Sequence, residues 1–155
     1  MSGIERTPTM TANNLPSPYV ASASNEAGGS AYLAFDKADS QWIANTNNTQ
    51  WIKFDFGIIR WACDEYRWTC QGADRAPNTW TFEGSNDDSS WTTLSSHSGI
   101  TWSDFETKTF TVTNTKAFRY YRWSISTING GTNVEADEIS IFAPQRSGGA
   151  LMSFI

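Results

Sequence analysis

Hydrophobic and polar residues alternate with a period of two along much of this chain. The clearest case lies within residues 77 to 91, where Trp80 and Phe82 are separated and flanked by threonine and glutamate. Such alternation predicts a strand with one buried face and one polar face. Residues 84 to 90 read Gly-Ser-Asn-Asp-Asp-Ser-Ser, a composition that favours a turn, and hydrophobic residues resume at Trp91. This stretch predicts a β-hairpin.

The same period recurs in other segments, and helical periodicity does not. We expect about eight strands, at residues 19–24, 52–56, 58–69, 77–83, 91–94, 107–112, 118–125 and 134–142, with one helical turn at 31–35. The side chains expected to be buried together are Phe54, Phe56, Trp80, Phe82, Phe110, Trp123 and Ile125. Short strands separated by turns predict an all-β fold, an antiparallel two-sheet sandwich of the jelly-roll kind.

The hairpin also carries a resemblance to a known family. Its sequence, Pro-x-x-Trp-x-Phe-x-Gly-Ser-Asn-Asp-x-Ser-x-Trp, resembles the central hairpin of the discoidin domain, also called the coagulation-factor C-type domain. Other segments are similar to that family in the same order: Ala34 to Trp42, Trp51 to Gly57, Phe118 to Trp123 and Glu138 to Phe142. The resemblance covers roughly residues 15 to 143. It implies a galactose-binding-like jelly roll, a fold shared by many carbohydrate-binding modules.

A chain of 155 residues is expected to form one domain, here residues 15–143. Residues 1–14 are polar and unpatterned, which predicts an N-terminal arm. Residues 144–155 form a tail in which Gly148-Gly149 precedes four apolar side chains: Leu151, Met152, Phe154 and Ile155. We expect this tail to anchor the protein to another polypeptide. The alternative is that it folds back onto its own domain.

The net charge disfavours two classes of partner, and the spacing of the cysteines disfavours a disulfide. The net charge of −5 disfavours a nucleic-acid backbone or an anionic membrane as partner, and no apolar run is long enough to span a membrane. The start of the chain lacks the pattern of an export signal. Cys63 and Cys70 lie seven positions apart, which is about 23 Å along an extended strand. A disulfide needs Cα atoms within about 7 Å, so two free, buried thiols are expected.

Little in the sequence points to catalysis. The one histidine, His97, lies in a Ser-His-Ser-Gly turn, without a nucleophile motif nearby. Carboxylates occur mainly as adjacent pairs, whose members point to opposite faces of a strand. We therefore expect a protein that is not an enzyme.

The resemblance implies a structural calcium ion. In that family an ion joins the early Asp-containing loop to a glutamate at the start of the last strand, and the matching ligands here are Asp36, Asp39, Ser40 and Glu138. Lys37 stands where the family has glycine, and the loop is one residue shorter. Two alternatives therefore stay open: Lys37 supplies the cation itself, or the two aspartates only cap the loop backbone.

Sugar binding needs an aromatic face together with planar polar groups. Loops between the expected strands carry such residues, and we select Tyr19, Asn47, Arg75, His97, Trp102 and Asn129 as ligand-binding candidates. Many sugar-binding relatives place an arginine at the end of the strand before the central hairpin. Trp68 occupies that position here, with Arg67 and Arg75 nearby.

Together these observations favour a non-catalytic binding module of a phage particle, as a tail or capsid-decoration protein. Such a particle reaches the exterior by lysis, which fits a chain without an export signal. The tails would then contact other virion proteins or copies of the chain, and the loops would bind a glycan on the host cell surface. The alternative is an extracellular carbohydrate-binding module accessory to a glycoside hydrolase.

Overall fold

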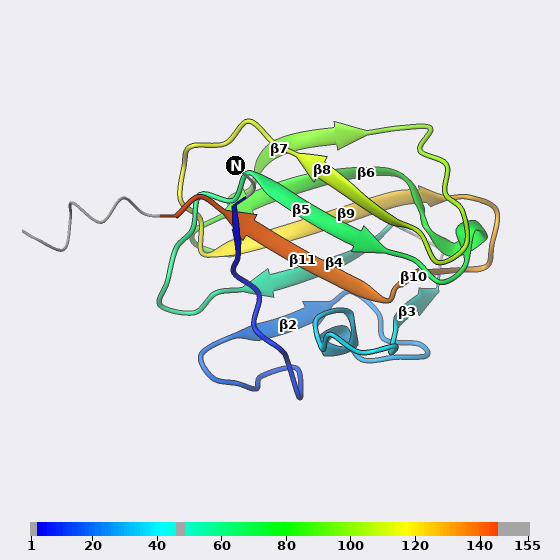
Figure 1. The fold of residues 1–155 in the computed structure, drawn as a ribbon, viewed down its shortest axis with the longest axis horizontal. Coiled ribbons are helices and arrows are strands. Elements are labelled where there is room, and N and C mark those ends of the chain that lie inside the picture. The colour runs from blue at the N-terminus through cyan, green and yellow to red at the C-terminus, as the bar shows by residue number, and fades with distance from the viewer. Residues whose placement is uncertain (1–2, 46–48, 146–155) are drawn as a thin grey trace, which may run out of the picture.

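The computed structural model describes residues 3–45 and 49–145. Two antiparallel sheets face each other in a sandwich, and a third, two-stranded sheet closes one end (Figure 1). The strands in chain order are β1 (Ile4–Glu5), β2 (Val20–Ala23), β3 (Trp42–Asn45), β4 (Gln50–Asp55), β5 (Glu65–Thr69), β6 (Pro77–Ser85), β7 (Thr92–His97), β8 (Thr107–Thr111), β9 (Tyr120–Ile128), β10 (Asn133–Ala136) and β11 (Glu138–Ala143). Single 3₁₀ turns form η1 (Ala31–Ala34) and η2 (Ala73–Arg75). In the described part of the chain, no helix has the length and apolar character needed to cross a membrane.

The larger sheet has the order β2-β4-β9-β6-β7, and the other has the order β1-β11-β5-β8. Strands β10 and β3 pair beside them, and all named pairs are antiparallel. This architecture confirms the predicted two-sheet jelly-roll sandwich. The short, tightly connected strands follow from the Ser-, Thr-, Asn- and Gly-rich composition, which favours turns over helices.

The core is aromatic and lies between the two large sheets. All seven side chains predicted to be buried are buried. Trp123 lies at its centre, with ring centroids 5.5 Å from Tyr66 and 5.2 Å from Phe82. The Tyr66 hydroxyl accepts a hydrogen bond of 2.8 Å from the Trp80 indole, so a polar group from each sheet is satisfied inside the core. Cys63 and Cys70 are both buried and free, as predicted.

The strand predicted at residues 58–69 is much shorter in the structure. It begins only at Glu65, and Ile58 is 90% exposed. Gly57, with φ of 71°, turns the chain out of the sheet after β4. The chain then contacts the sandwich again at Trp61, which forms an isolated bridge with Phe118. The prediction of a strand over residues 58–64 was therefore wrong. It rested on apolar residues that do not alternate regularly with polar ones.

The hairpin is confirmed, but its turn begins later than the sequence predicted. Strand β6 continues through Gly84 to Ser85, and Gly84 is buried. The turn follows at residues 86–91, where the Asp87 carboxylate accepts hydrogen bonds from the N–H groups of Ser89 and Ser90. Gly84 is thus a strand residue rather than a turn residue.

The segment expected to form an N-terminal arm packs on the sandwich over its described part, residues 3–14. Strand β1 pairs with β11 and forms an edge of the smaller sheet. Met10 is buried in the core, and its N–H donates to the carbonyl of Phe35 at 2.9 Å. The prediction that Leu151, Met152, Phe154 and Ile155 anchor the chain falls on residues 146–155, outside the described residues.

The two ends of the sandwich differ in character. One end, which we call the loop end, carries η2, the loop at residues 98–106 and the loop between β9 and β10. The opposite end carries the tip of the β6–β7 hairpin and the start of β9.

Candidate functional site

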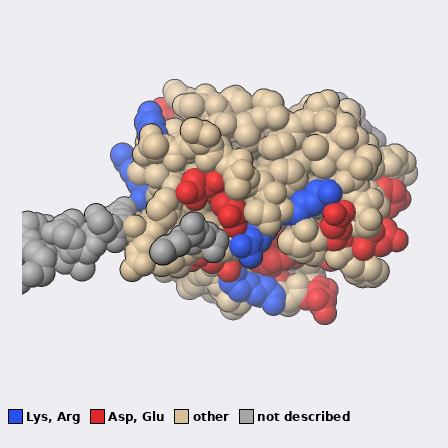
Figure 2. Space-filling view, turned by 45° about the horizontal axis from the view of Figure 1, so that its top comes forward, with Lys and Arg blue, Asp and Glu red and all other residues tan. Residues whose placement is uncertain are grey.

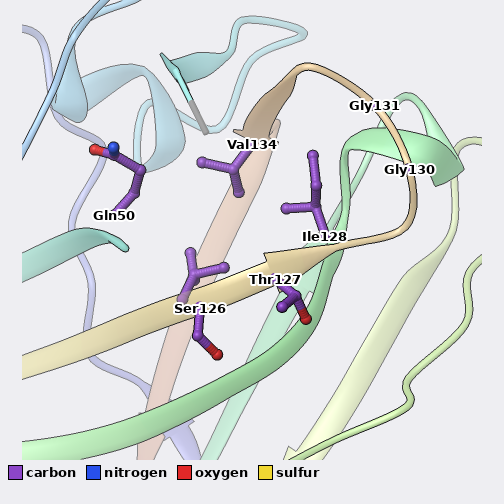
Figure 3. A pocket seen from close by; sticks show the side chains of 8 residues that line it. Gln50, Ser126, Thr127, Ile128, Gly130, Gly131 and Val134 are labelled. Atoms are coloured by element: carbon purple, nitrogen blue, oxygen red, sulfur yellow. The ribbon is translucent and has the colours of Figure 1, made fainter. Parts of the chain in front are cut away.

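A pocket of about 220 Å³ opens at the loop end, between the start of β4 and the end of β9. Gln50 at the start of β4 forms one side, and Ile125 to Ile128 at the end of β9 form another. Gly130, Gly131 and Val134 complete it from the β9–β10 connection and β10. Figure 3 shows Ile128 and Val134 inside the arc of this loop, while the hydroxyl groups of Ser126 and Thr127 point away from the arc. The pocket therefore has apolar walls and a polar rim.

The loop over the pocket is tied to η2. The N–H of Gly131 donates to the carbonyl of Asp74 at 2.9 Å. Gly130 has φ of 110°, a conformation that favours glycine, so the Gly-Gly pair allows the sharp return into β10. These contacts fix the position of the loop relative to the sandwich.

A buried carboxylate, Glu135, holds η2 in place from below. Its side chain is fully buried, accepts the N–H of Gly72 at 2.7 Å and forms an ion pair with Arg75 at 2.9 Å. Because burial of an unpaired charge is costly, these two contacts offset the cost of burying the carboxylate. Arg75, predicted to bind a ligand, is thus engaged in holding the loop end together.

Two other predicted ligand residues also form structural contacts at the loop end. Asn129 donates to the carbonyl of Ala76 at 3.0 Å. The indole N–H of Trp102 donates to the carbonyl of Pro77 at 2.7 Å, and its ring lies 6.2 Å from that of Phe110. The side chains are close to the pocket, but they hold neighbouring loops on the sandwich and do not line it.

The remaining described candidates do not line the pocket either. His97, at the end of β7, stacks on Trp80 with centroids 4.7 Å apart, and burial lowers the pKa of its imidazole. Tyr19 lies at the opposite end of the sandwich, where it packs near Phe54 and Phe56. It cannot share a site with the loop-end residues. Asn47 lies outside the described residues.

The residues that line the pocket were missed by sequence reasoning. Gln50, Ile128 and Val134 belong to three strands that are far apart in the sequence, so no local pattern groups them. The Gly130-Gly131 pair marks this place in the sequence only as a loop, since paired glycines favour turns.

The predicted calcium loop contains a lysine ion pair. The Lys37 ammonium contacts the carboxylate of Glu5 and lies 3.8 Å from that of Glu138. The backbone N–H of Lys37 donates to the other Glu138 oxygen at 2.9 Å, and Lys37 has φ of 57°. Burial raises the pKa of Glu138 to about 7, against the opposing effect of Lys37. A cationic side chain therefore occupies the position next to Glu138.

The other predicted metal ligands do not converge on Glu138. Asp36 accepts the N–H of Ala38 at 2.9 Å, which is the backbone-capping role. Asp39 is exposed, and its charge adds to the effect of burial that raises the pKa of Asp137 to about 6. Ser40 is half-buried in the loop before β3. Within residues 3–45 and 49–145, no three His, Cys, Asp or Glu side chains are placed to hold a metal ion. These residues do not fit a calcium ion, and they support the alternative in which Lys37 supplies the charge.

We therefore expect a chelator to leave the melting temperature of the protein unchanged. Replacing Lys37 by methionine should lower the free energy of unfolding by about 1 kcal/mol, because two carboxylates lose a partly exposed partner. Thermal unfolding with EDTA or with calcium chloride measures the first effect, and denaturant unfolding of the variant measures the second. A melting temperature that falls with EDTA and recovers with calcium would show that the ion binds after all.

The fold defines the class of domain, an antiparallel, galactose-binding-like jelly-roll sandwich, as the resemblance implied. Among solved structures, the F5/8 type C domain of a Bacteroides fragilis protein aligns with a TM-score of 0.71 and 15% identity, over 84% of this chain and 94% of that one. The chitosan-binding module 1 of the chitosanase/glucanase from Paenibacillus sp. IK-5 aligns with a TM-score of 0.68 and 21% identity, over 80% and 94%. CpGH89CBM32-5 from Clostridium perfringens, solved with GalNAc-β-1,3-galactose, aligns with a TM-score of 0.67 and 18% identity, over 81% and 95%. No protein-family model and no curated protein matches the sequence.

Proposed function

We propose that this chain is a non-catalytic carbohydrate-binding module and that the loop-end pocket receives its sugar. The observation that carries this proposal is the pocket itself, whose apolar walls, Ile128 and Val134, lie beside the polar side chain of Gln50 and the backbone of Gly130 and Gly131. A sugar ring presents both C–H faces and hydroxyl groups, and such a mixed lining suits both.

The electrostatics of the pocket support binding rather than catalysis. Its lining, as far as the described residues define it, includes neither a carboxylate nor a histidine. Glycoside hydrolysis uses a pair of carboxylates on either side of the scissile bond, and this pocket does not bring such a pair together. Two of the structures aligned above are named as carbohydrate-binding modules, one of them from a chitosanase/glucanase, which favours an accessory role beside a catalytic domain.

The phage-particle hypothesis receives less support. It rested on the lack of an export-signal pattern and on anchoring by the two terminal segments, of which residues 146–155 are outside the described part. The aligned structures above support the carbohydrate-binding alternative. An extracellular location accords with this function and remains part of the proposal.

Binding of the protein to an array of neutral and charged glycans tests the proposal, with Ile128→Glu as the key variant. A glutamate in the pocket should weaken sugar binding at least tenfold, because bound sugar would cover a charge that has no partner there. Ile58→Glu is the matched control, since Ile58 is 90% exposed and lies away from the loop end. Circular dichroism and melting curves should show both variants folded. If no glycan binds to the folded wild-type protein, or if both variants bind equally well, the proposal is wrong.

A further inference from the structure

We propose that the sugar site continues from the loop-end pocket into a groove on the outer face of the five-stranded sheet, and that its ligand is an uncharged oligosaccharide chain. This inference rests on the proposed function and specifies its substrate class. It predicts that one sugar ring binds in the pocket while further rings lie across the sheet.

The groove has a volume of about 340 Å³, larger than the pocket, and it meets the pocket at Ser126, which lines both. Seven of its nine lining residues are serine or threonine, and the other two are Trp80 and His97. The two cavities therefore lie on either side of the last part of β9. A chain of sugars that leaves the pocket past Ser126 enters the groove.

The register of the sheet explains how the groove crosses the strands. Trp51 on β4 lies opposite Ser124 on β9, which lies opposite Thr81 on β6, which lies opposite Ser96 on β7. The neighbours of this row in sequence, such as Ile52 and Trp123, are buried, so the row itself faces outward. Four strands span about 14 Å. That length accommodates more than one sugar ring.

The chemistry of the lining specifies a neutral ligand. Serine and threonine hydroxyls both donate and accept hydrogen bonds, as sugar hydroxyls require, and the threonine methyl groups contact C–H faces. Among the described residues, neither cavity is lined by Lys, Arg, Asp or Glu. Burial lowers the pKa of His97, which favours the neutral form of its ring. On the face that Figure 2 presents, which is turned from a view with the smaller sheet in front, most charged groups gather in the lower half.

A charged sugar would lose its hydration in these cavities without gaining a partner of opposite charge. Uronic acids and glucosamine should therefore bind more weakly than the neutral sugars of the same stereochemistry. This specificity would differ from that of the aligned chitosan-binding module, whose name denotes a cationic polysaccharide.

The test measures dissociation constants by calorimetry for mono- to tetrasaccharides of the neutral gluco-, galacto-, manno- and xylo-series. For at least one series, the tetrasaccharide should bind the wild-type protein about tenfold more tightly than the monosaccharide, equivalent to one or two net hydrogen bonds. In Ser96→Trp, a large side chain placed in the groove should abolish that gain and leave the monosaccharide affinity unchanged. Thr109→Trp is the matched control, because Thr109 is also exposed on an edge strand, β8, but belongs to the other sheet. It should behave as the wild type.

Each other outcome identifies which idea fails. Equal affinity for mono- and tetrasaccharides, or an undiminished gain in Ser96→Trp, overturns the extended groove and leaves the proposed sugar pocket standing. Preference for oligouronates or chitosan oligomers overturns the assignment of a neutral ligand. Absence of binding by every carbohydrate overturns the proposed function together with this inference.

Discussion

Replacement of Arg75 by alanine is expected to lower the free energy of unfolding by about 3 kcal/mol. The variant leaves the fully buried Glu135 carboxylate without its ion-pair partner, while the hydrogen bond from Gly72 remains. Removal of one member of a buried ion pair is costly because the other charge stays desolvated. The estimate is at the lower end of the usual range because the Arg75 side chain is itself about a third exposed. Urea unfolding at neutral pH measures the effect.

Two further variants separate this explanation from others. Adding Glu135→Gln to Arg75→Ala removes the buried charge but keeps an acceptor for Gly72, so the double variant should recover much of the lost stability. Arg67→Ala breaks a partly exposed arginine–carboxylate pair with Glu65 and should cost about 1 kcal/mol or less. If Arg75→Ala melts like the wild type but loses glycan binding, then Arg75 contacts the ligand, as the sequence predicted.

Replacement of Gly84 by alanine is expected to lower the free energy of unfolding by about 1–3 kcal/mol. A Cβ atom at this position would lie 2.5 Å from a carbon of the Phe118 ring. That ring is buried. The N–H of Trp61 donates to the carbonyl of Phe118 at 3.1 Å, and the N–H of Phe118 donates to the carbonyl of Trp61 at 2.9 Å. Because the ring also packs against Tyr121, with centroids 6.0 Å apart, it cannot move aside without disturbing the core. At an unobstructed site the same substitution would stabilise the protein slightly by restricting the unfolded chain.

A double-mutant cycle with Phe118→Ala tests this mechanism. In the Phe118→Ala background the clash is absent, so the added methyl group should cost much less, and the coupling energy should be about 1 kcal/mol or more. Denaturant unfolding of the four proteins gives this energy directly. Equal costs of Gly84→Ala in both backgrounds would mean that the glycine is required for another reason.

Much of the fold was accessible from the sequence because burial in a sheet leaves a local pattern. Residues two apart point to the same face, so Phe54 and Phe56, or Trp80 and Phe82, identify core positions without any knowledge of their partners. The resemblance of the hairpin and of other segments to the discoidin family then indicated the jelly roll among two-sheet folds. The pattern failed at residues 58–64, where apolar residues occur without regular alternation and the left-handed conformation of Gly57 redirects the chain.

The candidate site was much less predictable, since its geometry depends on contacts between residues far apart in the chain. Arg75 was selected for its chemistry, but its partner Glu135 lies 60 positions away, on β10. Gly84 was assigned to a turn, whereas its role depends on the Phe118 ring. The sequence by itself determined the strands, the aromatic core and the family of folds, because these follow from local periodicity. Only the tertiary structure decided which residues form the pocket and groove, because register and loop packing bring Gln50, Ser126 and Val134 together.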